Sequence, residues 1–343
     1  MFGFLKESTD CFGVDVGSSS VRVVQLRRAF GKYELVSFGS AEVPENISQS
    51  DSKVDQEAIG GIVKELVRSL HIVINKVVMA LPGDSIFTTV VKLPKMPLAE
   101  IQKAVKYQAE QNIPLKPKEV RTDWQVISET PDKKYLNIII IAAPLSKVEK
   151  TMHIAEAAGL EINALEINAI AAARALQTSE PLYAILNIGA THTEVAIIEN
   201  GVMSHTRAIP IGGQALTRAI ALSLGIEQSQ AEQFKRKFGI LPDQLEGQLF
   251  KAAKPILFNL SEEITRSLKF YYDQYGKNVT LLKLTGGSAR LIGFQDYLSD
   301  MLGIGVIYGN PWAMIVHRTE IADQLNRNAF DYATAIGLAM REL

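Results

Sequence analysis

The chain has 343 residues, of which 47% are hydrophobic and 21% charged, and its formal net charge is −1. These values are typical of a globular protein with two or more domains and exclude extensive disorder. Lysine and arginine are scattered rather than clustered, which argues against nucleic-acid binding. The single cysteine, Cys11, precludes an intramolecular disulfide and suits a reducing compartment. The five histidines lack metal-ligand spacing, so any metal is expected to arrive with a nucleotide.

The chain also lacks the sequence signals of a membrane or secreted protein. Its first residues show no signal-peptide pattern, and the longest apolar run, 138–145, is shorter than a bilayer span. The last helix is followed directly by residues 341–343, without an amphipathic tail. We therefore expect a soluble, cytoplasmic protein that does not insert into a membrane itself.

The first motif is the stretch FGVDVGSSS at residues 12–20, which predicts a buried strand followed by a turn of small residues. Such a turn exposes consecutive backbone N–H groups that can bind phosphate, because small side chains let the anion come close. Asp15 would repel phosphate directly and is better placed to hold Mg²⁺ through water. The phosphate-binding candidates are Asp15, Gly17, Ser18, Ser19 and Ser20. A simple β-hairpin turn is the alternative.

The next part of the chain predicts two strands, a helix and then a mixed module. Alternation predicts strands at 21–26 and 33–43, and helical spacing predicts an amphipathic helix at 55–70. Residues 77–167 predict an α+β subdomain with helices at 98–112 and 146–158. An alanine-rich helix, 168–176, then leads to the boundary between the two halves.

The second half opens with a copy of the first motif. Residues 184–198, AILNIGATHTEVAII, align without a gap over residues 12–26, FGVDVGSSSVRVVQL. The copy has Asn187 in place of Asp15, and an amide cannot take a proton. His192 can donate to a phosphate when protonated, or it can simply face solvent in the turn. The copy adds the phosphate-binding candidates Asn187, Gly189, Ala190, Thr191 and Thr193.

Further elements complete the second half. Strands are expected at 203–210, 280–284 and 305–308, and helices at 214–224, 229–238, 249–275, 291–302 and 332–341. Gly212 and Gly213 either bring backbone near the terminal phosphate or only end a strand before a helix. Glu232 and Lys235 share one helix face, which fits a nucleoside contact or a surface ion pair.

Two lobes, each beginning with the same strand pattern, are therefore expected. The first lobe core is 1–76, joined by a C-terminal helix at about 328–343, and 77–167 is the inserted α+β subdomain. The interlobe connection is 168–180, the second lobe core is 181–226 with 277–327, and the helical subdomain is 227–276. The predicted class is α/β, built from duplicated βββαβα units.

The motifs resemble those of the actin-like ATPase superfamily, whose two phosphate loops come from duplicated lobes and whose adenosine loop is a later glycine pair. Here that pair lies in TGGSA, 285–289. Neither loop fits the lysine-bearing P-loop or the dinucleotide glycine pattern. Within the superfamily, LPKMPL at 93–98, QAEQNIP at 108–114 and NPW at 310–312 are similar to the PilM family of type IV pilus assembly proteins, relatives of FtsA.

This resemblance implies a site and a partner. ATP or ADP with Mg²⁺ would bind between phosphate loops on opposite lobes, and the nucleoside would be bordered by Glu232, Lys235, Gly286, Gly287 and Ser288. The expected partner is the cytoplasmic N-terminal peptide of the inner-membrane protein PilN, which would recruit the protein to the inner face of the cytoplasmic membrane. Other inner-membrane components and ATPases of pilus assembly are expected partners by analogy.

The expected activity is that of a nucleotide-binding scaffold or switch, at most a weak ATPase. Asn187 removes one charge that would help to order metal and attacking water. Glu166 is the nearest catalytic candidate by analogy, or else an exposed residue at a strand end. The alternatives are an actively hydrolysing ATPase or small-molecule kinase, and an FtsA-like filament-forming protein.

Overall fold

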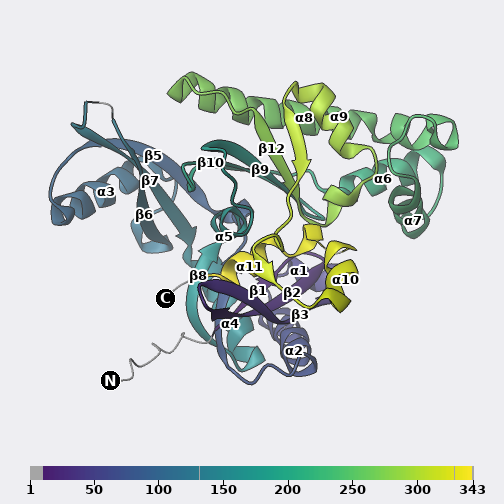
Figure 1. Cartoon of the computed structure of the whole chain (residues 1–343), viewed down its shortest axis with the longest axis horizontal. Helices are drawn as coiled ribbons and strands as arrows, with labels where there is room; N and C mark the ends of the chain where they lie inside the picture. Colours follow the sequence, from purple (N-terminus) through teal and green to yellow (C-terminus); the bar gives the residue numbers. More distant parts are fainter. Residues whose placement is uncertain (1–10, 131, 328, 342–343) are drawn as a thin grey trace. The chain divides into compact units, whose positions relative to one another are not determined.

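The computed structural model describes residues 11–130, 132–327 and 329–341. The chain divides into two compact units, each with its own main sheet (Figure 1). The first unit comprises Met1–Pro82, Pro144–Leu176 and Asn310–Leu343, and the second comprises Gly83–Ala143 and Gln177–Gly309. Within the described residues, no helix has both the length and the apolar character needed to cross a bilayer.

The first unit is built on a six-stranded sheet with the order β14-β3-β2-β1-β4-β8. Its central strand, β1, runs antiparallel to β2 and parallel to β4. The strands are β1 (Phe12–Val16), β2 (Ser20–Ala29), β3 (Lys32–Glu42), β4 (Lys76–Leu81), β8 (Glu161–Ile167) and β14 (Ile315–Val316).

Helices cover both faces of this sheet because the side chains of β1 alternate between two cores. Phe12 and Val14 pack into a core with α2 and α4, whereas Gly13 lies against the backbone of α11. Ser52 caps α2 by accepting a hydrogen bond from the Asp55 N–H at 3.2 Å. The helices are α1 (Glu45–Ser48), α2 (Lys53–Ser69), α4 (Leu145–Ala158), α5 (Asn168–Ala175), α10 (Ala322–Arg327) and α11 (Ala333–Ala339), with the 3-10 turns η5 (Thr319–Ile321) and η6 (Ala329–Asp331).

The second unit repeats this arrangement in a five-stranded sheet with the order β11-β10-β9-β12-β13. Here β9 runs antiparallel to β10 and parallel to β12, as β1 does with β2 and β4. The register irregularity of the β2–β3 pair, between Gln25 and Leu26, recurs at the aligned positions Ile197 and Ile198. The strands are β9 (Leu182–Ile188), β10 (Thr193–Glu199), β11 (Val202–Ile209), β12 (Leu281–Thr285) and β13 (Gly305–Tyr308). The predicted duplicated α/β fold is confirmed.

Long helices complete the second unit. The helix α8 continues through Pro255 and ends at Gly276, whose left-handed conformation suits a glycine. The first turns of α8 share a buried core with α6 and α7 (Figure 1). The helices are α6 (Gly213–Leu224), α7 (Gln228–Phe238), α8 (Gln248–Tyr275) and α9 (Phe294–Leu302), with the 3-10 turns η3 (Gln244–Gly247) and η4 (Gly287–Arg290).

The inserted segment forms a separate three-stranded sheet with the order β5-β7-β6, packed against α3 (Figure 1). Its elements are η1 (Gly83–Ser85), β5 (Phe87–Pro94), α3 (Leu98–Asn112), η2 (Pro117–Glu119), β6 (Val120–Glu129) and β7 (Tyr135–Pro144). The sequence-based boundary of 77–167 is wider than this segment. The structure pairs β4 with β8 in parallel inside the six-stranded sheet, so both strands belong to the first unit and not to the inserted segment. Parallel strands are usually buried on both faces, and the helices of the first unit cover both faces of this sheet.

Candidate functional site

The first phosphate-loop candidate is a tight turn between β1 and β2. The Gly17 N–H donates to the Ser20 carbonyl oxygen at 3.0 Å, and the Val43 N–H donates to the Ser19 carbonyl oxygen at 3.0 Å. A Cβ at Gly17 would lie 3.1 Å from the Ser20 oxygen, which explains the small residue. Ser18 is half-buried and Ser19 exposed, so this turn presents small polar residues at the surface of the first unit.

Asp15 lies at the end of β1, just before this turn, and is 8% exposed. Its Oδ2 lies 3.8 Å from Nη1 of Arg22, whose Nη2 lies 3.7 Å from Oδ1 of Asp331. Sequence reasoning missed Arg22, although the antiparallel register that places it opposite Asp15 follows from the predicted hairpin. The described residues contain no cluster of three or more carboxylate, imidazole or thiol groups able to hold a metal. A single carboxylate fits a hydrated Mg²⁺ held mainly by phosphates, and not a metal held by the protein alone.

The second phosphate-loop candidate has the same internal hydrogen bond as the first. The Gly189 N–H donates to the His192 carbonyl oxygen at 2.9 Å, and Gly189 and His192 align with Gly17 and Ser20. Thr191 Oγ1 lies 3.2 Å from Nδ1 of His192. Thr193 is fully buried and donates its hydroxyl proton to the Ile211 carbonyl oxygen at 2.6 Å. This hydrogen bond therefore joins the residue that follows His192 to the residue that precedes Gly212.

Gly212 and Gly213 pack directly on the second loop. The Gly213 N–H donates to the Gly189 carbonyl oxygen at 3.0 Å, and the Gln214 N–H donates to the Ala190 carbonyl oxygen at 2.9 Å. A Cβ at Gly212 would lie 2.6 Å from the Ala190 carbonyl group, so only glycine fits at this position. The start of α6 and the second loop therefore form one backbone unit.

The predicted adenosine loop also touches the second loop. Gly286 has a φ of 88°, and a Cβ there would lie 2.5 Å from Oδ1 of Asn187. Both observations require glycine. The Ser288 hydroxyl donates to the Gly189 carbonyl oxygen at 3.0 Å. Gly287 begins η4 and is exposed.

Glu232 and Lys235 form an inward-facing pair on α7. The Lys235 Nζ lies 2.6 Å from Glu232 Oε2 and donates to the Gly213 carbonyl oxygen at 2.9 Å and to Thr217 Oγ1 at 2.7 Å. Burial by itself raises the pKa of Glu232, but hydrogen bonds from Lys235 and Thr217 outweigh it and lower this pKa to about 2. Burial lowers the pKa of Lys235. Sequence reasoning missed Thr217, although it lies one helical turn after Gly213.

Glu166 lies in the first unit, at the end of β8, and both of its carboxylate oxygens are engaged. Arg174 donates to Oε1 at 2.6 Å and to Oε2 at 2.8 Å, and Nη1 of Arg341 lies 3.2 Å from Oε1. Arg174 also donates to the Gly337 carbonyl oxygen at 2.6 Å. The carboxylate thus joins β8, α5 and Arg341, which follows α11, and both of its oxygens already contact guanidinium groups.

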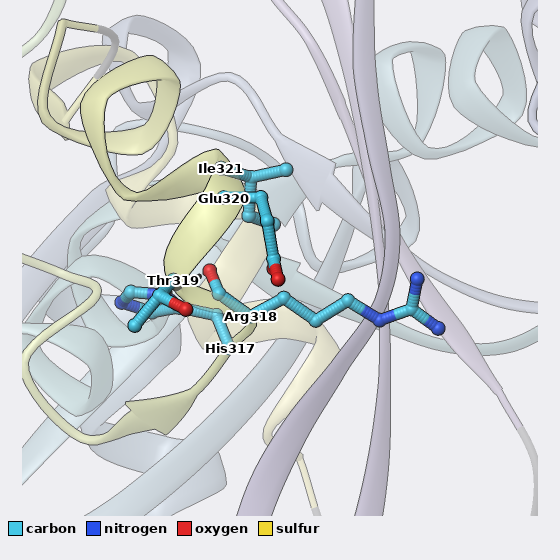
Figure 2. A pocket seen from close by; sticks show the side chains of 5 residues that line it. All are labelled: His317, Arg318, Thr319, Glu320 and Ile321. Atoms are coloured by element: carbon cyan, nitrogen blue, oxygen red, sulfur yellow. Dashed lines mark hydrogen bonds between the residues drawn. The ribbon is translucent and has the colours of Figure 1, made fainter.

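The structure thus brings most of the predicted residues of the second unit into one cluster. This cluster contains the second loop, the start of α6, the Glu232–Lys235 pair and the loop 286–288. Asp15, residues 17–20 and Glu166 belong to the first unit. A depression of about 640 Å³ in the first unit is lined by one continuous segment, His317 to Ile321, and contains none of the predicted residues (Figure 2).

Solved structures share this fold. The chain matches a structure titled PilM-PilN type IV pilus biogenesis complex with a TM-score of 0.86 and 26% identity, over 98% of this chain and 99% of that one. It matches EutJ from Carboxydothermus hydrogenoformans with a TM-score of 0.59 and 18% identity, over 96% and 88% of the two chains. MreB5 of Spiroplasma citri bound to AMPPNP matches with a TM-score of 0.56 and 13% identity, over 96% and 95%. The last two matches show the actin-like fold alone.

Sequence relatives agree with this fold. The cell division protein FtsA of Bacillus subtilis (strain 168) is 24% identical over 200 residues, which are 54% of this chain and 43% of that protein. The chain spans less than half the length of the curated relatives it matches. The family model described as type IV pilus assembly protein PilM matches residues 13–343, and the chain therefore belongs to this family, as its motifs predicted.

Proposed function

We propose that this chain is a nucleotide-binding scaffold of type IV pilus assembly. The observation that carries the proposal is the duplicated turn, in which Gly17 and Gly189 make the same hydrogen bond to the residue three positions later. A turn that presents successive backbone N–H groups can bind phosphate. The match to a structure bound to AMPPNP supports the same ligand class.

The proposed ligand is ATP or ADP with Mg²⁺. When bound, Mg²⁺ would neutralise phosphate charge, and Asp15 would hold its water ligands. Backbone N–H groups of both loops would contact the phosphates, with Gly212 and Gly213 supporting the second loop. The nucleoside would be bordered by α7 and by the loop Gly286–Ser288.

The proposed role is a scaffold or slow switch rather than a vigorous enzyme. Asn187 cannot accept a proton, and the carboxylate of Glu166 is occupied by Arg174 and Arg341. No strong candidate for a general base therefore emerges from the predicted residues. Rapid release of phosphate, or transfer of phosphate to a small molecule, would overturn this part of the proposal. Sedimentation of the pure protein that requires nucleotide would instead support a filament-forming role.

The proposed partner is the cytoplasmic N-terminal peptide of PilN, since the similar solved structure is described as a PilM-PilN complex. Binding this peptide would bring the protein to the inner face of the cytoplasmic membrane. We propose that the exposed surface of the inserted segment, Gly83–Ala143, forms one wall of the peptide site. Tyr107 is an exposed residue of α3. We expect its substitution to abolish binding of the peptide.

A calorimetric titration of nucleotide-free protein with Mg-ATP tests the ligand. We expect Asp15→Ala to weaken Mg-ATP binding about tenfold, because a charge-assisted contact through a water ligand is lost. Asp300→Ala removes an exposed carboxylate of α9 and serves as the matched control. Equal affinities of the Asp15 variant and the wild type would reject the assignment of Asp15, and absence of any Mg-ATP binding would reject the nucleotide proposal.

A further inference from the structure

The outer side of β3 pairs with a strand over only part of its length. Near its start, Tyr33 and Glu34 pair with β14, whereas residues 37–42 pair with β2 alone among the described strands. Val36 separates the two parts, because the register with β2 shifts there. Alternate residues of a strand direct their backbone N–H and C=O groups to opposite sides. Part of the backbone of residues 37–42 therefore faces outward without a partner strand in the described chain.

This open edge lacks the features that usually protect edge strands. Lysine, proline and short length are common protections against pairing with another chain. Residues 37–42 have the sequence SFGSAE, in which Glu42 is the only charged residue. By contrast, the edge strand β6 carries Arg121, Asp123 and Glu129, and the edge strand β13 has four residues. Residues 37–42 therefore remain able to pair with a further strand.

A groove lies beside this open edge, between the end of β3 and one face of α2 (Figure 1). Its volume is about 700 Å³. The residues that line it include the small or apolar Ala41, Ala58, Gly61 and Ile62 and the charged Lys64 and Glu65. Side chains of an added strand would therefore have a place to bind next to the backbone that it pairs with.

Gly61, which lines this groove, has no packing reason to be glycine within the described chain. A Cβ at this position would meet nothing within 4 Å, whereas a Cβ at the adjacent Gly60 would clash with α4. Glycine is a poor helix former, so alanine would suit the helix better if the helix alone mattered. Close approach of another polypeptide along the groove would explain why position 61 has no side chain.

We infer that the outer side of residues 37–42 binds an extended segment of a partner protein as an added strand, with alternate side chains in the groove beside α2. The unpaired backbone determines this kind of partner, because a strand edge is completed by another extended backbone. The position of β14 shows that the same side of β3 accepts a strand. The small residues of the groove favour small apolar side chains. The inference goes beyond the proposed function, since it uses none of the residues proposed to bind nucleotide or the PilN peptide.

The probe for this site is a synthetic peptide that alternates valine and alanine over seven residues, with a lysine at each end for solubility. It is titrated into the full chain, and its affinity is measured by fluorescence anisotropy. When the peptide is bound, we expect hydrogen exchange of the amides in residues 37–42 to slow about tenfold or more.

Two methylated peptides test whether the backbone makes the contact. Each carries N-methyl groups on every second residue, and the two patterns are offset by one residue. Only one pattern blocks the N–H groups that face β3. We expect that peptide to lose about tenfold or more in affinity and the other to stay within about twofold of the unmethylated peptide.

A variant of the groove tests the place of binding. Gly61→Met puts a side chain into the groove without a clash inside the chain, so we expect the variant to fold and its affinity for the peptide to fall about tenfold. Val54→Met is the matched control, because Val54 is an exposed residue of α2 outside the groove, and its affinity should equal that of the wild type. Thermal unfolding checks the fold of both variants.

Four results would overturn the inference. They are no binding of the unmethylated peptide to the wild type, equal affinities of the two methylated peptides, undiminished binding to a folded Gly61→Met variant, and dimerisation of the pure chain that the peptide reverses. The last result would show that a second copy of this chain occupies the edge in place of a partner protein. None of these results depends on whether the chain binds Mg-ATP, so the proposed function is tested separately.

Discussion

Phe30 has an unusual backbone conformation for its residue type. It forms the tip of the β2–β3 hairpin with Gly31, and the two residues have φ values of 51° and 77°. The corresponding hairpin of the second unit has Asn200 and Gly201, with φ values of 51° and 79°. A two-residue turn with positive φ at both positions favours asparagine followed by glycine, and phenylalanine is strained there.

We therefore expect Phe30→Asn to increase the free energy of unfolding by about 1 kcal/mol. Chemical denaturation measures the change. The reciprocal variant, Asn200→Phe, places the same side chain in the duplicated hairpin and should lower stability by a similar amount. Phe30 is fully exposed, so its removal costs no packing inside the described chain. A loss of stability in Phe30→Asn would show that Phe30 makes a stabilising contact after all.

Glu166 provides a test of structural against catalytic roles. Glu166→Gln removes the negative charge that faces Arg174 and Arg341. Because two guanidinium groups are then left beside a neutral amide, we expect a loss of about 2–3 kcal/mol in the free energy of unfolding. Glu161→Gln changes an exposed residue of the same strand and should have an effect below about 0.5 kcal/mol.

The two roles of Glu166 predict opposite results. A structural carboxylate lowers stability when it is replaced and changes phosphate release only in proportion to unfolding. A catalytic carboxylate would leave the melting temperature unchanged and abolish phosphate release. Measurement of both quantities on Glu166→Gln therefore separates the two roles.

At the scale of elements, adjacent glycines in α2 are expected to differ in their effect on stability. A Cβ at Gly60 would lie 2.5 Å from the Ala157 Cβ and 2.8 Å from the Ile154 carbonyl oxygen, both in α4. A Cβ at Gly61 would meet nothing within 4 Å. The close approach of α2 and α4 therefore requires the first glycine only.

We expect Gly60→Ala to reduce stability by about 1–3 kcal/mol, because the two helices must move apart. We expect Gly61→Ala to increase stability by about 0.5–1 kcal/mol, since alanine favours the helix and nothing obstructs its methyl group. Thermal unfolding of the two variants in parallel measures both effects. A stabilising effect of Gly60→Ala would show that the helices are not packed as closely as described.

The sequence predicted most elements because local patterns determine them. The helix expected at 98–112 is α3 with the same bounds, and the one expected at 146–158 differs from α4 by one residue. The boundaries of the inserted segment were less predictable. Strands β4 and β8 are separated by 79 residues between Leu81 and Glu161, and nothing in either pattern shows that they pair with each other.

The candidate site was predictable in its turns and less so in its side chains. The duplicated motif predicted both Gly17 and Gly189. The hydrogen bond that the two turns have in common explains why the motif occurs twice. The inward orientation of Lys235 does not follow from its spacing to Glu232, because a pair three residues apart on a helix can face either solvent or protein. Only the packing of α6 against α7 determines that choice.

At the scale of the whole molecule, duplication explains why one chain carries two similar turns with different chemistry. Both sheets have the same strand order around their central strands, so the fold determines the backbone path of each turn. The side chains are less constrained, and the strand before the first turn has Asp15 where the strand before the second has Asn187. Under the proposed function, this asymmetry favours binding of a nucleotide over its rapid hydrolysis, because the backbone groups proposed to bind phosphate are present twice and the carboxylate once.

A scaffold that uses nucleotide as a switch makes a quantitative prediction. If Mg-ATP changes the affinity for the N-terminal PilN peptide by some factor, the peptide must change the affinity for Mg-ATP by the same factor. We expect that factor to be about 5-fold or more, as for typical coupled sites. Calorimetric titrations of each ligand, with and without a saturating amount of the other, measure both sides of the cycle.

The variant Asp15→Ala supplies the control for this coupling. With Mg-ATP binding weakened, addition of Mg-ATP at a concentration that saturates only the wild type should no longer change the affinity for the peptide. The affinity of the nucleotide-free variant for the peptide should equal that of nucleotide-free wild type, since the substitution lies outside the inserted subdomain. A peptide affinity that is the same with and without Mg-ATP in the wild type would show that the nucleotide has a structural role only, because a ligand with no preference between two states cannot shift their equilibrium.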